Sequence, residues 1–304
     1  MTREEINQDI HEEIDDLEER EEKKRLFKKI AIILVIIFVL GFIFFLYTTF
    51  ISTSSIIVNE ERLTYKNLNQ EYNGLKIIHF TDFKYGTTTT IKDLEKLVNI
   101  INDRNPDLVF YTGDLISKNT KLNSKETENI IKQLRNINSR LGKYAIIGDE
   151  DKDNYNTIMN ESGFNILNNS YDLIYDNNTN PILVTGTSSL IKKKNDIKKT
   201  LSYYDVENHN SDIFSISLVH EADTVTDLIN TRKSNIYLAG HSANKTIRLP
   251  IFGKILGYKG NNKYKNNYYK IDDAELFISS GIGSDSHIRL FYRPSINFFR
   301  ISNK

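Results

Sequence analysis

Residues 74–86 read GLKIIHFTDFKYG, and this stretch decides the fold. Its apolar part, residues 75–80, is short, contains β-branched residues and lies between Gly74 and Gly86. Such a run predicts a buried strand, which would deliver Asp82 to its carboxyl end. In an open α/β sheet, ligands and metals gather at the carboxyl ends of the strands. We therefore expect Asp82 to lie at a functional edge of a sheet.

Four more apolar runs share this design, because each is followed by an acidic residue or a histidine. Residues 108–112 lead to Asp114, residues 144–147 to Asp149 and Glu150, residues 214–219 to His220, and residues 236–239 to His241. Five strands that each present an oxygen or imidazole ligand at one edge indicate a metal or catalytic site there.

The segments between these runs have helical periodicity. Residues 93–104 and 126–140 carry apolar residues three and four apart, and each segment leads directly into a strand. This order predicts βαβ units and a mostly parallel sheet. Further strands are expected at residues 181–186 and 275–279, and closing strands of a second sheet at residues 288–291 and 296–301. His79, within the first strand, is expected to be a hydrogen-bonded core histidine.

The composition excludes several kinds of protein. The chain has 304 residues, with 40 basic and 40 acidic ones, so no net charge favours nucleic acid as a partner. It has no cysteine, which excludes disulfides, cysteine–zinc sites and thiol catalysis. Residues 261–269 are rich in Asn, Lys and Tyr and are most simply an exposed loop; a lipid- or polyanion-facing patch is the alternative.

One segment has the properties of a membrane span. Residues 30–51 contain no charged residue, and 22 helical residues extend ~33 Å, enough to cross a bilayer core of ~30 Å. Five basic residues precede this segment, and residues 52–59 after it are neutral. This bias places the N-terminus in the cytoplasm and the C-terminal domain outside. The predicted organisation is a tail (1–29), a transmembrane helix (30–51), a connector (52–73) and one domain (74–304).

The tail before this segment is acidic and then basic. Residues 3–22 contain eleven Asp and Glu residues, and their few isoleucines and leucines follow one helical face. We interpret the tail as a solvated, partly helical cytoplasmic segment. The alternative is a short helix that binds a protein partner, although so narrow an apolar stripe is marginal by itself.

The five edge segments together resemble a known family. They read TDFKYG, YTGDLIS, IIGDED, LVHEAD and AGHSANKTIRLPIFG, and the tail SSGIGSDSHIRLFYRPSINFFRI extends the likeness. In this order they resemble the calcineurin-like metallophosphoesterases, in particular the membrane-associated bacterial branch. The resemblance implies a four-layer α/β sandwich of two mixed sheets flanked by helices. It also implies hydrolysis of a phosphoester by a pair of metal ions that polarise the phosphoryl oxygens.

Several residues match the family's metal ligands and others depart from them. Asp82, Asp114, His220 and His241 match, and Asp149 replaces an asparagine with another oxygen ligand. The departures are Lys84 and Ala243, at two histidine ligands of the first metal, and Glu150, at the catalytic histidine. The resemblance therefore implies a degenerate site that holds one divalent ion (Zn, Mn or Fe) on Asp114, Asp149, His220 and His241, or none.

Lys84 and Glu150 are the two catalytic candidates that remain. We expect the Lys84 ammonium to fill the space of the missing first metal and to pair with Asp82 and Asp114, since buried carboxylates require a compensating charge. Glu150 is expected to donate a proton to the leaving group. The function that follows is extracytoplasmic, metal-dependent hydrolysis of a lipid or envelope phosphoester. The alternative is a catalytically impaired, membrane-anchored module that binds a ligand or a partner.

Overall fold

The computed structural model describes residues 3–47, 55–152, 154–176, 180–206, 212–241, 248–249, 253–254, 259–285, 289 and 292–303. The chain divides into two compact units, Met1–Ile51 and Ser52–Lys304. Each unit is described here by itself.

The first unit consists of one long helix, α1 (Arg3–Leu46). Its 44 residues extend ~66 Å, so the acidic tail and most of the apolar segment form one continuous helix. The part from Ile14 to Leu46 is long and apolar enough to cross a membrane. Its large apolar side chains lie exposed, as expected for a helix that lipid would cover. Residues 48–51 of the predicted span lie outside the described residues.

The second unit contains two six-stranded sheets. The first sheet has the order β1 (Ile57–Tyr65), β14 (Ser295–Asn303), β2 (Leu75–Phe80), β3 (Leu108–Tyr111), β4 (Gly142–Ala145) and β5 (Phe164–Ile166). Strands β2 to β5 are parallel, as the βαβ units predicted. Strand β14 runs antiparallel to β2 and parallel to β1.

The second sheet is also mixed. Its order is β12 (Tyr268–Ile271), β13 (Ala274–Ile278), β9 (Ile236–Ala239), β8 (Ser215–Val219), β7 (Ile182–Gly186) and β6 (Ser170–Ile174). The four central strands are parallel, and an antiparallel strand closes each side. A short hairpin, β10 (Arg248–Leu249) and β11 (Gly253–Lys254), stands apart from both sheets.

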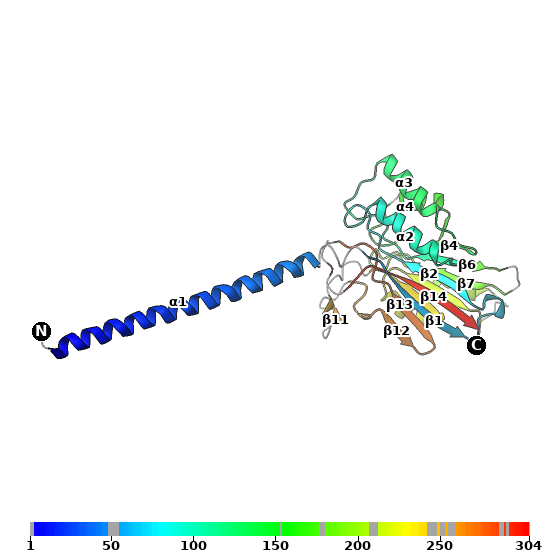
Figure 1. Ribbon diagram of the computed structural model, residues 1–304. Coiled ribbons are helices and arrows are strands. Elements are labelled where there is room, and N and C mark those ends of the chain that lie inside the picture. Colours follow the sequence, from blue (N-terminus) through cyan, green and yellow to red (C-terminus); the bar gives the residue numbers. More distant parts are fainter. Residues whose placement is uncertain are drawn as a thin grey trace. The chain divides into compact units, whose positions relative to one another are not determined.

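Helices cover the outer face of each sheet, and those of the first sheet are seen in Figure 1. The first sheet carries α2 (Ile91–Asp103), α3 (Ser124–Arg135) and α4 (Asn154–Glu161), and the second carries α5 (Ile197–Thr200) and α6 (Thr224–Thr231). Short 3₁₀ helices occur at η2 (Gln70–Tyr72) and η3 (Ser202–Asp205). The two sheets pack against each other through a separate apolar core. The predicted four-layer α/β sandwich is confirmed.

Strand β2 illustrates how the sequence specifies these layers. Leu75 and Ile77 point into the core between the sheets, whereas Ile78 and Phe80 point into the core beneath the helices. Side chains alternate between the two faces of a strand, so a strand buried on both faces must be apolar throughout. This is why the run at residues 75–80 was the strongest signal in the sequence.

The structure corrects three interpretations of the chain's organisation. Residues 296–301 belong to β14, which pairs with β2 in the first sheet and is not a closing strand of the second. Residues 57–65, expected within a connector, form β1; the exposed and charged middle of this strand, residues 60–62, interrupts its apolar signal. Helix α3 ends at Arg135, five residues before the predicted end. The strand predicted at residues 288–291 lies almost wholly outside the described residues.

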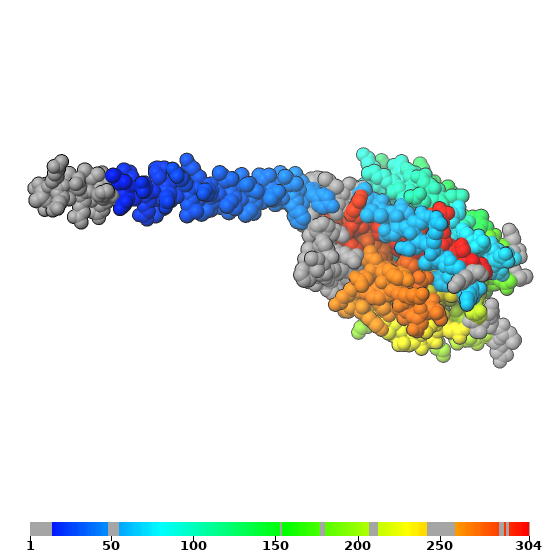
Figure 2. Space-filling model, turned by 60° about the horizontal axis from the view of Figure 1, so that its bottom comes forward, coloured from blue at the N-terminus to red at the C-terminus, as the bar shows by residue number. Residues whose placement is uncertain are grey.

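The segment predicted as an exposed loop is only partly exposed. In the space-filling view the orange residues before and within β12 and β13 form a broad part of one face of the domain (Figure 2). Asn262, Lys263 and Lys265 are exposed there, as expected. Asn261 and Tyr264, however, are buried, with 1% and 6% of their surface exposed. Asn261 therefore has a role inside the domain.

His79 is a core histidine, as predicted. It is fully buried, and its Nε2 lies 2.9 Å from Thr112 Oγ1. Asn297 Nδ2 lies 3.3 Å from its Nδ1. Burial lowers the pKa of His79 to about 3, so the ring stays neutral in the folded protein.

We expect the His79→Gln variant to lose part of the acid sensitivity of the domain. The unfolded chain binds a proton on His79 near pH 6.5, whereas the folded chain does not, so this residue destabilises the fold as the pH falls below 6.5. Between pH 7 and pH 5 the wild type should lose about 2 kcal/mol more than the variant. Denaturant unfolding of the full chain in detergent, followed by tyrosine fluorescence, measures this difference. Equal losses would contradict a neutral His79.

Candidate metal centre

The predicted site residues gather at the edge where the carboxyl ends of both sheets meet. Asp82, Asp114 and Asp149 follow β2, β3 and β4 of the first sheet. His220 and His241 follow β8 and β9 of the second sheet. The first sheet thus supplies carboxylates and the second supplies imidazoles.

The backbone is strained where these residues turn into the site. Asp82, Lys84, Asp114 and His241 have φ values of +50°, +54°, +64° and +52°. This left-handed conformation costs a residue with a Cβ roughly 1 kcal/mol or more, and such residues concentrate at functional sites. Hydrogen bonds hold two of these turns together, since Asp82 N donates to Gly113 O (2.9 Å) and Lys84 N donates to Asp114 O (3.1 Å).

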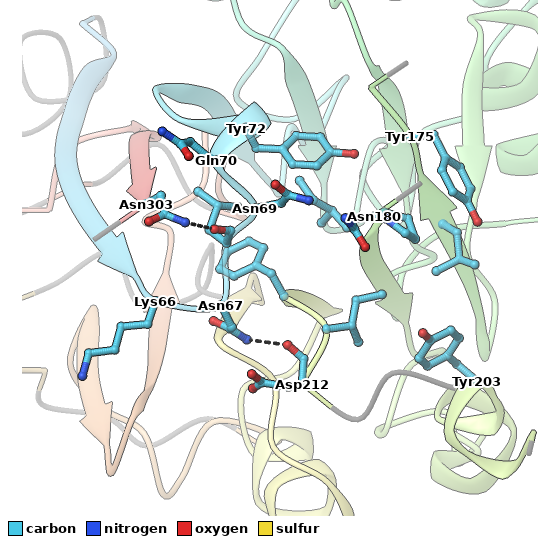
Figure 3. Close-up of a pocket in the computed structure, with 16 residues that line it drawn as sticks. Lys66, Asn67, Asn69, Gln70, Tyr72, Tyr175, Asn180, Tyr203, Asp212 and Asn303 are labelled. Atoms are coloured by element: carbon cyan, nitrogen blue, oxygen red, sulfur yellow. Dashed lines mark hydrogen bonds between the residues drawn. The ribbon is translucent and has the colours of Figure 1, made fainter. Parts of the chain in front are cut away.

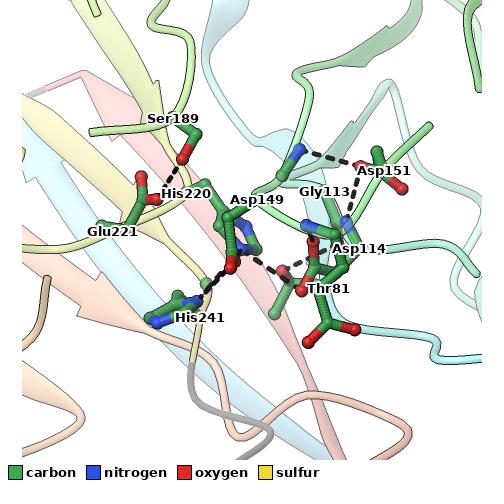
Figure 4. A network of polar contacts seen from close by, with 12 residues as sticks. Thr81, Gly113, Asp114, Asp149, Asp151, Ser189, His220, Glu221 and His241 are labelled. Atoms are coloured by element: carbon green, nitrogen blue, oxygen red, sulfur yellow. Dashed lines mark hydrogen bonds and ion pairs between the residues drawn. The ribbon is translucent and has the colours of Figure 1, made fainter. Parts of the chain in front are cut away.

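Four of the predicted metal ligands converge on one point (Figure 4). One ligand atom each from Asp114, Asp149, His220 and His241 lies within 4.8 Å of all the others. Asp149 Oδ1 is 2.9 Å from His241 Nδ1 and 3.1 Å from His220 Nε2. The two ring nitrogens are 3.3 Å apart. These distances show four donor groups directed at a common centre.

A backbone carbonyl fixes the orientation of the His220 ring on the side that faces away from the other ligands. Its Nδ1 lies 2.6 Å from the carbonyl oxygen of Thr112, so Nδ1 carries the proton and donates it. Its Nε2 then points at Asp149 and, at 3.5 Å, at Asp114 Oδ2. A histidine whose far nitrogen is held by a backbone carbonyl is the usual arrangement of a metal ligand.

The charges of this group stabilise one another. Burial disfavours the charged ring, but the carboxylates of Asp114 and Asp149 outweigh it and raise the pKa of His220 well above its usual value. Burial also opposes ionisation of Asp149, yet hydrogen bonds from His220 and His241 hold the pKa of Asp149 far below its usual range. The metal-free group therefore holds a proton on His220 at neutral pH.

Lys84 is buried beside this group, and three carboxylates surround its ammonium group. Its Nζ lies 2.8 Å from Asp114 Oδ2, 2.8 Å from Glu150 Oε2 and 3.4 Å from Asp285 Oδ1. Burial alone would lower the pKa of Lys84, but the carboxylates of Asp114 and Asp82 raise it well above its usual value. An ammonium group has three N–H donors, and here three carboxylates face them.

Asp82 differs from the expectation. The ion pair predicted between Lys84 and Asp82 is replaced by those to Glu150 and Asp285. Asp82 is 1% exposed, and neither of its carboxylate oxygens has a hydrogen-bond partner among the described residues. Burial raises the pKa of Asp82, although His220 and Lys84 oppose this effect. Such a buried carboxylate is a suitable ligand for a cation, which would compensate its charge.

Glu150 lies at the rim and is held by hydrogen bonds. Its backbone N donates to Asp114 Oδ1 (2.9 Å), and its Oε2 accepts from Lys84 and from Lys118 N (3.1 Å). In this arrangement its carboxylate acts as an acceptor. The predicted role of Glu150 as a proton donor stays a prediction. Ala243, at the other replaced histidine, lies outside the described residues.

Two acids next to the predicted ligands, the half-buried Asp151 and the buried Glu221, have supporting roles that the sequence did not reveal. Asp151 accepts from Asp114 N, Leu115 N and Gly148 N at 2.8 to 2.9 Å, and so joins the loops after β3 and β4. Burial, assisted by Asp114, raises the pKa of Asp151 to about 7. Glu221 accepts from Ser189 Oγ and from Leu190 N (2.9 Å), away from the centre. Asp151 and Glu221 have the same functional group as the predicted carboxylate ligands, but their loops direct them to backbone N–H groups.

The donor set fits a divalent transition ion. Two carboxylates and two imidazoles balance its charge, and this mixture of oxygen and nitrogen ligands suits Zn, Mn or Fe. His220 has the backing expected of a ligand, and Asp82 adds a buried carboxylate beside the four. When bound, such an ion supplies a Lewis acid and an activated water for attack on phosphorus.

A separate pocket lies at the opposite edge of the sandwich (Figure 3). It measures about 600 Å³ and lies where β1 ends and β7 and β8 begin. Its polar side chains mainly join loops: Asn67 Nδ2 donates to Asp212 O (3.1 Å), and Asn303 Nδ2 donates to Leu68 O. None of the predicted site residues lines this pocket.

Comparisons with known proteins agree with this geometry. A family model described as "Calcineurin-like phosphoesterase" matches residues 75–279. "Uncharacterized metallophosphoesterase YkuE" from Bacillus subtilis is 26% identical over 263 residues, which cover 84% of this chain and 89% of that protein. "UDP-2,3-diacylglucosamine pyrophosphatase LpxG" from Chlamydia muridarum is 22% identical over 283 residues, which cover 75% of this chain and 83% of that protein.

Metal binding should be strongly pH-dependent. Because Asp114 and Asp149 stabilise the charged His220, an ion that binds Nε2 must displace a proton. We expect about one Co²⁺ per chain, with an affinity that rises about tenfold per pH unit between pH 6 and pH 8. Titration of the detergent-solubilised chain, followed by visible absorption, measures both. An affinity independent of pH would contradict the charge of His220, and two ions per chain would show that Lys84 does not fill the first site.

Proposed function

Because the chain belongs to the calcineurin-like phosphoesterase family, we propose that it is a membrane-anchored phosphoesterase that uses one divalent ion. The observation that carries this proposal is the convergence of Asp114, Asp149, His220 and His241 within 4.8 Å. These four residues would hold the ion, which would polarise the phosphoryl group and activate a water.

Lys84 would take the place of a second cation. One divalent ion together with the Lys84 ammonium would compensate the carboxylates of Asp114 and Asp149 and that of Glu150, which also faces the ammonium. The 2.8 Å contact between Lys84 Nζ and Asp114 Oδ2 supports this role, since Asp114 then lies between the two positive charges. The Lys84 contact also fixes one oxygen of Asp114 in the orientation that the site requires.

The position of β1 supports a substrate at the membrane surface. Ile57, the first residue of β1, pairs with Ser295 of β14, and Asn297 of β14 pairs with His79 of β2. Because β14 and β2 are antiparallel, Ser295, two residues before Asn297, lies level with Thr81, two residues after His79. Ile57, which pairs with Ser295, therefore lies level with Thr81 as well, directly before Asp82. The chain that follows the predicted span therefore joins the domain at the edge that carries the site. A relative named as a diacylglucosamine pyrophosphatase points to the same substrate class, a lipid phosphoester.

The charge distribution supports an extracytoplasmic domain. Five basic residues precede the apolar segment, and basic residues next to a span favour the cytoplasmic side. The N-terminal tail would then lie in the cytoplasm, where a protein partner could bind its acidic helix, and the phosphoesterase domain would face the envelope.

A second candidate function is non-catalytic binding. The Lys84–Glu150 ion pair favours it, because three carboxylates surround the ammonium and Glu150 Oε2 already faces Lys84 Nζ and Lys118 N. In that case the centre would hold a phosphorylated ligand or a metal without turnover, and the anchored domain would act as a binding module.

Metal-dependent hydrolysis should require Asp114. We expect the full chain in detergent to hydrolyse an aryl phosphomonoester or phosphodiester with added Mn²⁺, Zn²⁺ or Fe²⁺, and to release phosphate from vesicles that contain phosphatidic acid. Asp114→Asn should lower the rate on the order of 100-fold, because it removes a charged ligand. Lys125→Ala, on exposed α3, is the matched control.

The outcomes of this assay separate the candidates. Activity that persists in Asp114→Asn would exclude this centre as its source. A chain that binds the ion but turns over neither the aryl esters nor the vesicles would favour the binding module.

Introduced cysteines should report the orientation. The chain has no cysteine of its own, so Lys125→Cys in the domain and Glu18→Cys in the tail provide single labels at exposed positions. In intact cells a membrane-impermeant maleimide should label Lys125→Cys only, and Glu18→Cys should react after permeabilisation. The reverse pattern would place the domain in the cytoplasm.

A further inference from the structure

Asn261 connects the two loops that carry the histidines. It lies before β12, and its side chain is 1% exposed. Its Oδ1 accepts from Ala222 N (2.6 Å), two residues after His220. Its Nδ2 donates to His241 O (2.9 Å) and to Gly240 O (3.3 Å). Because an N–H faces Oδ1 and carbonyl oxygens face Nδ2, only one orientation of the amide satisfies all three contacts.

The hydrogen bond from Asn261 Nδ2 is made to His241, a residue whose backbone is strained. His241 has a φ of +52°, which a residue with a Cβ rarely adopts without support. Its imidazole reaches Asp149 from this conformation, at 2.9 Å (Figure 4). The hydrogen bond from Asn261 holds the His241 carbonyl and so supports the backbone conformation from which the imidazole reaches Asp149.

Further hydrogen bonds fix the loop that carries Asn261. Asp223 N donates to Gly260 O (2.8 Å), and the Asp223 carboxylate accepts from Asn262 N (2.8 Å) and Lys263 N (3.0 Å). Gly260 has a φ of +88°, and a Cβ there would lie 2.8 Å from Glu221 Cγ. The loop is therefore docked closely on the segment that follows His220.

We propose that Asn261 is a positioning residue of the metal centre, which sets the affinity for the ion by holding the His241 backbone. This inference rests on the metal centre proposed above. Asn261 does not touch the ion in this arrangement; it acts through His241. Residues that orient metal ligands in this way change metal affinity about 10- to 100-fold when they are replaced.

Substitution of Asn261 tests the proposal through metal binding. Asn261→Ala in the full chain should weaken Co²⁺ binding about 10- to 100-fold and change the visible absorption of the bound ion. Asn261→Asp is isosteric and keeps the acceptor for Ala222 N, but it places an oxygen opposite two carbonyls; it should weaken binding at least as much. If Asn261→Ala does not fold, the isosteric Asn261→Asp variant provides the test.

Two comparisons separate positioning from general stability. Ile130→Val removes a buried methyl group from a core cluster that contains neither Asn261 nor His241, so it should lower the unfolding temperature but leave Co²⁺ affinity within about threefold of the wild type. His241→Ala and the double variant His241→Ala/Asn261→Ala should bind Co²⁺ equally, because the proposal assigns the effect of Asn261 to His241 and not to its contact with Ala222 N.

The possible results have distinct meanings. A folded Asn261 variant that binds Co²⁺ as tightly as the wild type would overturn the positioning role and leave the metal centre intact. Additive losses in the double variant would also overturn it. A wild-type chain that binds no Co²⁺ would overturn the metal centre itself, and the positioning role with it.

Discussion

The buried ion pair between Lys84 and Asp114 is the constraint on which the site depends. Both side chains are at most 1% exposed, and transfer of each charge from water costs several kcal/mol. Their attraction offsets this cost only if the remaining donors and acceptors are also satisfied. The backbone N of Glu150 satisfies the second oxygen of Asp114, and two more carboxylates satisfy the ammonium. Loss of Lys84 would remove the shortest cationic contact of the buried Asp114 carboxylate, and breaking such a buried pair costs about 3–5 kcal/mol.

The site is also the junction of the two sheets. His220 of the second sheet reaches across to the carbonyl of Thr112 in the first, at 2.6 Å. Gly113 permits this approach, since a Cβ there would lie 2.5 Å from Gly148 N and 2.9 Å from His220 Nδ1. The apolar core between the sheets therefore fixes the distance between carboxylates and imidazoles. A cavity in that core would therefore change the distance between these carboxylates and imidazoles.

Local sequence patterns sufficed for several strands, and the family resemblance supplied the candidate ligands, but neither predicted the contacts among these side chains. Residues 75–80 and 236–239 are strands β2 and β9 with the predicted bounds, because both are short, mostly apolar and largely buried. The four converging residues each follow a buried strand, and the family resemblance marked them as candidate ligands. The partners of Lys84 and the role of Asn261 depend on left-handed turns and on loops far apart in the chain. No local periodicity encodes these contacts.

If Lys84 takes the place of a metal, as proposed, the chemistry of an ammonium restricts what it can do. An ammonium cannot coordinate water or a phosphoryl oxygen; it can only donate hydrogen bonds. All three of its donors face carboxylates, so a phosphate could bind Lys84 only by displacing one of them. Asp285 is the weakest of the three, since its oxygen is 3.4 Å from Nζ and its side chain is 43% exposed. A substrate anion would thus enter on the side of Asp285, while Asp114 and Glu150 kept the ammonium in place.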